Sequence, residues 1–88
     1  MSRIERIRDA LAALQPTALE VVDDSHQHAG HEGARDGRGH FTVRIVSPVF
    51  AGKAPLARHR TVYAALGEMM QTDIHALVIE ARTPDEAG

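Results

Sequence analysis

One short stretch decides the fold: Phe41-Thr42-Val43-Arg44-Ile45, in which apolar and polar side chains alternate. This period of two predicts a β-strand with one buried face. Residues 18–23 predict a second strand, because Leu19 and Val21 share a face opposite Glu20. The segment 24–39 between them holds four glycines and charges of both signs, which favours a mobile loop between antiparallel neighbours over a tight hairpin turn.

Helices are predicted on either side of this strand pair. Ser2 and Glu5 have the spacing of a capping box, and apolar residues recur at helical spacing until Gln15-Pro16, so a helix is expected over about 2–14. After Ser47-Pro48, a second helix over about 55–70 begins with Pro55 in its first turn. Its expected apolar face consists of Leu56, His59, Tyr63, Leu66 and Met70.

A third strand over about 74–81 completes the predicted sheet, and Thr83-Pro84-Asp85-Glu86 indicates one further helical turn. A strand-helix-strand crossover joins parallel strands, so the three-stranded sheet should be mixed. The order α-β-β-α-β(-α) therefore predicts an α+β fold with the helices on one sheet face, formed by residues 1–88 as a single domain.

Composition narrows the function classes. The net charge of −2 gives no general attraction to phosphate, and the 3% aromatic content leaves few platforms for stacking bases. There is no cysteine and no run of about 18 apolar residues, which excludes disulfides and predicts a cytoplasmic protein. Neither a nucleophile elbow nor a phosphate-binding glycine loop occurs, so we do not expect an enzyme.

Histidine is the unusual residue type of this chain. Six histidines occur in 88 residues, and His26, His28 and His31 lie close together in the predicted loop. Neutral imidazole is a common metal ligand, so this imbalance indicates metal chemistry. Without thiols of its own, the chain can build a soft-metal centre only with sulfur from a partner.

Several stretches together resemble the BolA family, and they span nearly the whole chain. They are residues 19–26, 40–43, 47–53 and 58–63, and the His-Ala-Leu of residues 75–77 that opens the last strand. This resemblance implies a fold like the class II KH domain. It also implies partnership with monothiol glutaredoxins, with which BolA-like proteins share a [2Fe-2S] cluster. In that arrangement, the glutaredoxin cysteine and a glutathione thiol hold one iron.

The resemblance also implies two ligands to the other iron from this chain. One is the histidine opening the last strand, His75, and the other is a loop histidine, for which His28 aligns best and His31 is the rival. Alternative interpretations remain open: a solvated loop, a self-contained zinc site of His26, His28 and His31, and a hydrogen-bonded structural role for His75. We expect His40 to be structural and His59 to lie in the core.

A basic cluster supports an alternative function. Lys53, Arg58 and Arg60 lie at the start of the second helix, and bacterial BolA-like proteins are also described as transcriptional regulators, so DNA binding is the alternative. Three cations would give weak, salt-sensitive binding. The arginines could equally contact the glutaredoxin or glutathione, or pair with carboxylates such as Asp23, Asp24 or Glu68. A cluster-free protein-protein module is the third hypothesis.

Overall fold

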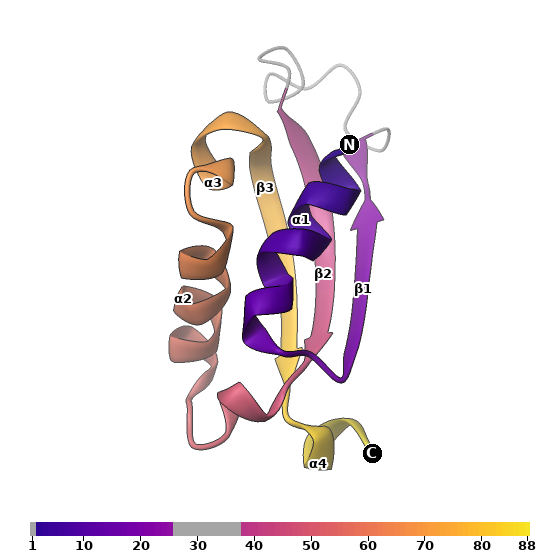
Figure 1. The fold of residues 1–88 in the computed structure, drawn as a ribbon. Coiled ribbons are helices and arrows are strands. Elements are labelled where there is room, and N and C mark those ends of the chain that lie inside the picture. The colour runs from indigo at the N-terminus through magenta and orange to yellow at the C-terminus, as the bar shows by residue number, and fades with distance from the viewer. Residues whose placement is uncertain (1, 26–37) are drawn as a thin grey trace.

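The computed structural model describes residues 2–25 and 38–88 (Figure 1). Along the chain its elements are helix α1 (Arg3–Leu11), the 3-10 turn η1 (Ala12–Leu14), strands β1 (Ala18–Asp23) and β2 (Gly39–Val46), the 3-10 turn η4 (Pro48–Phe50), helices α2 (Pro55–Leu66) and α3 (Met69–Thr72), strand β3 (Ile74–Arg82) and helix α4 (Pro84–Ala87). This order confirms the predicted sequence of elements.

The three strands form one sheet in the order β1-β2-β3. Strand β1 pairs antiparallel to β2, whereas β3 pairs parallel to β2. Helices α1 and α2 lie side by side over one face of this sheet (Figure 1). The predicted α+β class, with a mixed three-stranded sheet and helices on one face, is therefore confirmed.

The core lies between that sheet face and the two long helices. The central strand β2 contributes Phe41, Val43 and Ile45, each at most 1% exposed, and α1 contributes Ile7 and Leu11 at 0%. Each fully buried side chain of this kind stabilises the fold by about 1.5–3 kcal/mol. The alternating pattern of residues 41–45 therefore marks the strand that organises the core.

Both predicted helix caps are present. The Ser2 hydroxyl oxygen accepts a hydrogen bond from the Glu5 backbone N–H at 3.1 Å, which fixes the start of α1. At the other end of the chain, Thr83 and Glu86 form a reciprocal capping box that opens α4. The second cap has a consequence for the basic cluster, because it fixes the position of the Glu86 carboxylate.

The predicted face of the second helix is correct at Leu66 and wrong at Leu56 and Tyr63. Leu56 and Tyr63 are 61% and 40% exposed, whereas Val62 and Leu66 are buried, and His59 is half-buried and not part of the core. Leu66 lies at helical spacing from both Tyr63 and Val62, so the sequence pattern could not show which of these two rows of side chains is buried. Moreover, α2 ends at Leu66, where Gly67 has a φ of +56°, and Met70 belongs to the separate α3.

The other sheet face carries an exposed row of charges. Arg44 on β2 donates to Glu20 on β1 at 2.8 Å and to Glu80 on β3 at 2.9 Å. These two carboxylates raise the pKa of Arg44 through hydrogen bonds. Cross-strand pairs of opposite charge of this kind support the strand register.

Candidate functional site

His75 is the predicted ligand that the structure describes. It is the second residue of β3, directly after Ile74, whose side chain is 0% exposed in the core. The irregular step of the β2–β3 ladder falls at His75, since Ile74 pairs with Gly39 and Ala76 with His40, and such a step turns a side chain out of the regular alternation. The His75 side chain is accordingly exposed.

Two residues at the start of β2 approach the His75 ring. The Arg38 Nη2 atom lies 3.1 Å from His75 Nδ1, and the His40 and His75 ring centroids are 5.3 Å apart with a 49° tilt. Strand pairing explains this approach: Gly39 pairs with Ile74 and His40 with Ala76, with an irregularity between the two pairs. Sequence reasoning missed the His40–His75 contact, although both histidines open strands that were expected in one sheet.

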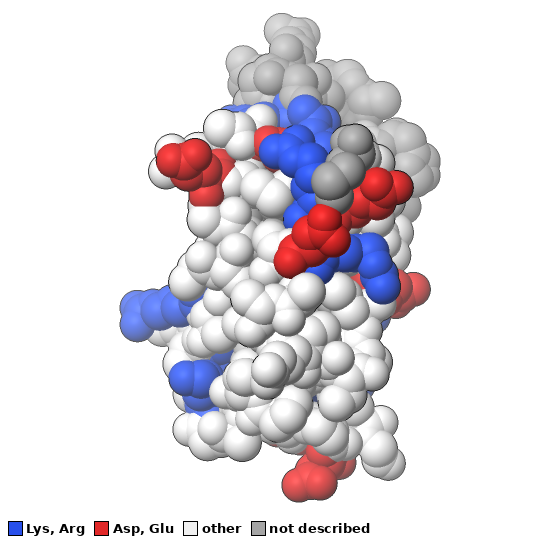
Figure 2. All heavy atoms as spheres, in the orientation of Figure 1, with Lys and Arg blue, Asp and Glu red and all other residues white. Residues whose placement is uncertain are grey.

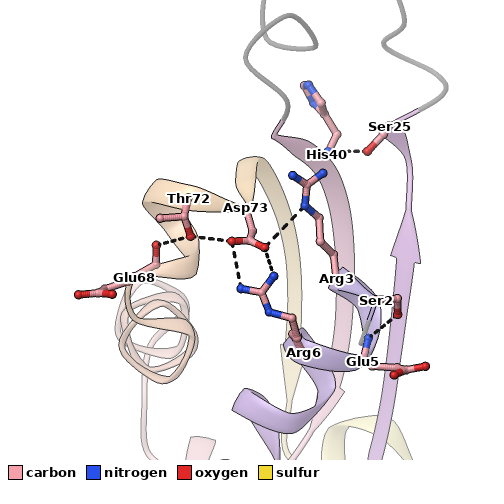
Figure 3. A network of polar contacts seen from close by, with 9 residues as sticks. All are labelled: Ser2, Arg3, Glu5, Arg6, Ser25, His40, Glu68, Thr72 and Asp73. Carbon is pink, nitrogen blue, oxygen red and sulfur yellow. Dashed lines mark hydrogen bonds and ion pairs between the residues drawn. The ribbon is translucent and has the colours of Figure 1, made fainter.

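His40 also joins the two chain segments that border residues 26–37. Its backbone N–H donates to the Ser25 hydroxyl at 3.0 Å (Figure 3), and its carbonyl accepts from the Asp24 N–H at 2.8 Å. The residue is only 9% exposed. These contacts agree with the structural role expected for His40.

Gly39 is required where these segments come together. A Cβ atom at this position would lie 2.7 Å from the Phe41 ring and 2.7 Å from the Ser25 hydroxyl oxygen. Only glycine leaves room for this approach without displacing a buried aromatic ring. The backbone that presents Arg38 and His40 is therefore closely packed.

A buried carboxylate supports the same end of the sheet. Asp73 is 6% exposed and ends α3, and it binds the Arg6 guanidinium, the Thr72 hydroxyl and, at 3.6 Å, Arg3 (Figure 3). The Thr72 hydrogen bond is the main cause that lowers the Asp73 pKa, and the two arginines lower it further. The Asp73 carbonyl also accepts from the Gly39 N–H at 2.9 Å. Asp73 thus connects α1 to the starts of β2 and β3.

Charged side chains concentrate near this end of the molecule. In Figure 2, blue and red atoms gather where the described residues meet the grey ones, and a broad uncharged area lies below them. Arg3 and Arg6 share the single carboxylate of Asp73. This ion network therefore belongs to the end of the molecule at which β3 starts (Figure 3).

The predicted loop ligands lie outside the described residues. This applies to His28, its rival His31 and His26, so the structure tests neither the His28–His75 pair nor the zinc alternative. Among residues 2–25 and 38–88, no group of three or more His, Cys, Asp or Glu side chains could hold a metal ion. A metal at His75 would need donors beyond the described part of this chain.

The basic cluster does not act as one surface. The Arg58 side chain is 15% exposed and donates to the Lys53 carbonyl at 2.8 Å, the Ala81 carbonyl at 3.1 Å and the Glu86 carboxylate. This ion pair lowers the Glu86 pKa to about 2. The expected pairing of Arg58 with a carboxylate is confirmed, but the partner is Glu86, brought close by the α4 cap, and not Asp23, Asp24 or Glu68. Lys53 and Arg60 are exposed.

The two candidate sites lie at opposite ends of β3. His75 stands at its start, whereas Arg58 bonds the carbonyl of Ala81 near its end. Six residues of strand separate them by about 20 Å. A single small ligand therefore cannot touch both His75 and Arg58.

The class of protein is a small α+β fold with an exposed histidine at the start of its last strand. Residues 11–86 match the family model described as BolA-like protein. The chain belongs to the BolA-like family, as its resemblance implied.

Similar proteins and structures support this membership. The chain is 47% identical over 91 residues to "SufE-like protein 1, chloroplastic/mitochondrial" of Arabidopsis thaliana, covering 97% of this chain and 24% of that protein. It is 43% identical over 83 residues to "DNA-binding transcriptional regulator BolA" of Escherichia coli (strain K12), covering 93% and 76%. The solved BolA domain of SufE1 from Arabidopsis thaliana superimposes with a TM-score of 0.85 at 46% identity, covering 98% of this chain and 96% of that chain.

The similar proteins differ in length and in compartment. The chain spans about half of "Protein BOLA1, chloroplastic" of Arabidopsis thaliana, 56% of its length, at 43% identity and 98% coverage of this chain. In the described part of this chain, no helix has the length and apolar character needed to cross a membrane. The expected cytoplasmic location stays a prediction, since two of these relatives carry organelle names.

Proposed function

We propose that this chain is an adaptor that binds a monothiol glutaredoxin and helps to hold a shared [2Fe-2S] cluster. His75 and one loop histidine, His28 with His31 as its rival, would ligate one iron. The glutaredoxin cysteine and a glutathione thiol would ligate the other. The observation that supports this most is the exposed His75 ring at the start of β3, in a chain of the BolA-like family.

The available donors fit such a cluster. The chain has no thiol, so each of its ligands to iron would be a nitrogen donor, and imidazole suits iron. When bound, the cluster would supply one-electron chemistry, and imidazole ligands raise its potential relative to thiolates, as in Rieske centres. Within the chain, the hydrogen bond from the Gly39 N–H to the Asp73 carbonyl supports the backbone from which His75 is presented, and the His40 ring lies beside the His75 ring.

Reconstitution with a monothiol glutaredoxin, glutathione, iron and sulfide tests the proposal. We expect a heterodimer whose visible spectrum differs from that of the glutaredoxin homodimer. His75→Ala should alter this spectrum, and His28→Ala should alter it more than His31→Ala if His28 is the loop ligand. His59→Ala is the matched control, because His59 lies on α2. A heterodimer spectrum unchanged by His75→Ala and by both loop variants would refute these ligands.

DNA binding is the second candidate function. It is favoured by the name of the Escherichia coli relative and by the exposure of Lys53 and Arg60. Arg58 is removed from this candidate surface, because its guanidinium is held by protein acceptors. Two phosphate contacts should give a shallow salt dependence, with log K falling by about 1.8 per tenfold rise in salt.

Charge reversal separates this function from the first. If Lys53 and Arg60 bind phosphate, the double variant Lys53→Glu/Arg60→Glu should abolish DNA binding and leave the shared-cluster spectrum unchanged. The comparison variant Arg8→Glu reverses an exposed charge on α1, away from this surface. DNA affinity that survives the double variant would exclude this surface.

A further inference from the structure

The hydrogen bond between Arg38 and His75 has only one possible direction. A guanidinium has five N–H donors and no acceptor, so Arg38 Nη2 must donate and His75 Nδ1 must accept across their 3.1 Å separation. An accepting Nδ1 carries the lone pair of the ring. In a neutral imidazole the proton then lies on Nε2.

This tautomer has no second lone pair to offer a metal. A neutral imidazole ligates through the one nitrogen that lacks a proton, which here is the nitrogen that Arg38 occupies. Iron could replace Arg38 at Nδ1 while Nε2 keeps its proton. Alternatively, iron could bind Nε2 after the proton has moved to Nδ1, where a guanidinium donor would face an N–H donor. On either route, the His75 ring would have to give up its hydrogen bond with Arg38 in order to serve as a ligand.

The setting of Arg38 suits such an exchange. It is half-buried and immediately precedes the first residue of β2, whereas His75 is exposed on the neighbouring strand. The His40 ring lies beside the His75 ring, with 5.3 Å between their centroids. A side-chain hydrogen bond of this kind contributes only a modest net free energy, so an incoming metal can displace it.

We propose that Arg38 is a positioning residue that holds His75 in the Nε2–H tautomer and competes with metal for its lone pair. This inference rests on the proposed role of His75 as a ligand. It adds a residue, Arg38, that determines how readily the His75 ring binds a metal. Arg38 keeps the imidazole oriented and occupied until a metal with its remaining donors arrives. Removal of Arg38 therefore strengthens metal binding at His75, whereas loss of a supporting residue would weaken it.

Nitrogen-resolved NMR of the full chain tests the tautomer without any metal. At a pH high enough that added base no longer changes its ring signals, the His75 ring should show a protonated Nε2 and an unprotonated Nδ1. In Arg38→Leu, the ¹⁵N resonance of Nδ1 should move toward the value of an imidazole nitrogen with no donor bound. Arg60→Leu removes the same charge from an exposed site on α2 and should leave the resonance in place.

A Co²⁺ titration of the same proteins, followed on the His75 ring signals, tests the competition. Arg38→Leu should tighten Co²⁺ binding at His75 by about twofold to tenfold, the value of one modest hydrogen bond. Arg60→Leu should not change it. The nitrogen shift distinguishes the lost hydrogen bond from the lost charge.

Two results would overturn the proposal: a protonated Nδ1 in the unaltered protein, or equal Co²⁺ affinity at His75 in the two variants. Neither measurement uses glutaredoxin or a cluster. Failure here therefore leaves the shared-cluster test intact, and failure of that test leaves the Arg38 result intact.

Discussion

The two ends of β3 each place an arginine beside a candidate site, and the acceptors that the two arginines contact differ in kind. Arg58 is 15% exposed in its side chain and is bound by a carboxylate and two carbonyls, all acceptors that belong to the fold. Arg38 donates to the ring of His75, an exposed histidine that we propose as a metal ligand. If His75 ligates a metal as proposed, its hydrogen bond with Arg38 has to be exchangeable, whereas the acceptors of Arg58 remain part of the fold.

The His75 end nevertheless depends on a structural ion network of its own. Asp73 holds Arg6 of α1 and, through its backbone carbonyl, the N–H of Gly39. The exchangeable contact at Arg38 is thus built on a backbone that is fixed two residues before His75. If His75 is a ligand, the Asp73 network would hold its backbone in place while the Arg38 hydrogen bond could be exchanged for a metal.

The largest effect is expected from Asp73→Ala. The substitution removes a 9%-exposed carboxylate and its charge-assisted hydrogen bonds, so the free energy of unfolding should fall by about 2 kcal/mol. For a domain of this size, the melting temperature would drop by about 10 °C. The His75 ring signals should also shift, because the β2–β3 junction loosens. Calorimetry measures the change in unfolding, and NMR measures the shift of the His75 ring signals.

Asp9→Ala is the matched control for this prediction, since Asp9 is an exposed aspartate of α1. Its effect on unfolding should stay within about 0.5 kcal/mol. If Asp73→Ala were as mild as Asp9→Ala, the support at the His75 end would not depend on the Asp73 network.

An intermediate effect is expected on the melting temperature, where substitution of Arg58 and substitution of Arg38 should differ. Arg58→Leu should lower the melting temperature by about 5 °C, because it leaves the Ala81 and Lys53 carbonyls without this donor and separates α4 from α2. Arg38→Leu should shift it by less than about 2 °C, since an exposed partner can turn to water. Equal shifts in thermal unfolding would remove the distinction between a structural and an exchangeable arginine.

The sequence was sufficient to predict the strands, the mixed sheet and both caps, because these depend on local patterns. It placed His75 correctly at the start of the last strand. It could not predict the Arg38 and His40 contacts, which arise from a parallel register with an irregularity between Gly39 and His40. It also could not identify Glu86 as the partner of Arg58, since 28 residues separate them in the chain.

The smallest expected effect is a change with pH at the Arg58 end. The Arg58 hydrogen bond and the Thr83 backbone N–H lower the pKa of Glu86 from 4.5 to about 2 in the folded chain. A lowered carboxyl pKa stabilises the fold above the unfolded pKa, and this contribution is lost as the pH falls through the folded pKa. Unaltered protein should therefore melt higher than Glu86→Gln at pH 7, with the difference shrinking between about pH 4.5 and pH 2.

Asp85→Asn supplies the comparison for this pH series, because Asp85 is the adjacent exposed acid in α4. Its difference from the unaltered protein should not follow the Glu86 curve. Glu86→Gln in an Arg58→Leu background should have little further effect at pH 7, since the carboxylate has then lost its main partner. If the two substitutions were instead additive, Glu86 would act on α4 through its cap with Thr83 alone, and the Arg58 end would be fixed by its two carbonyl acceptors.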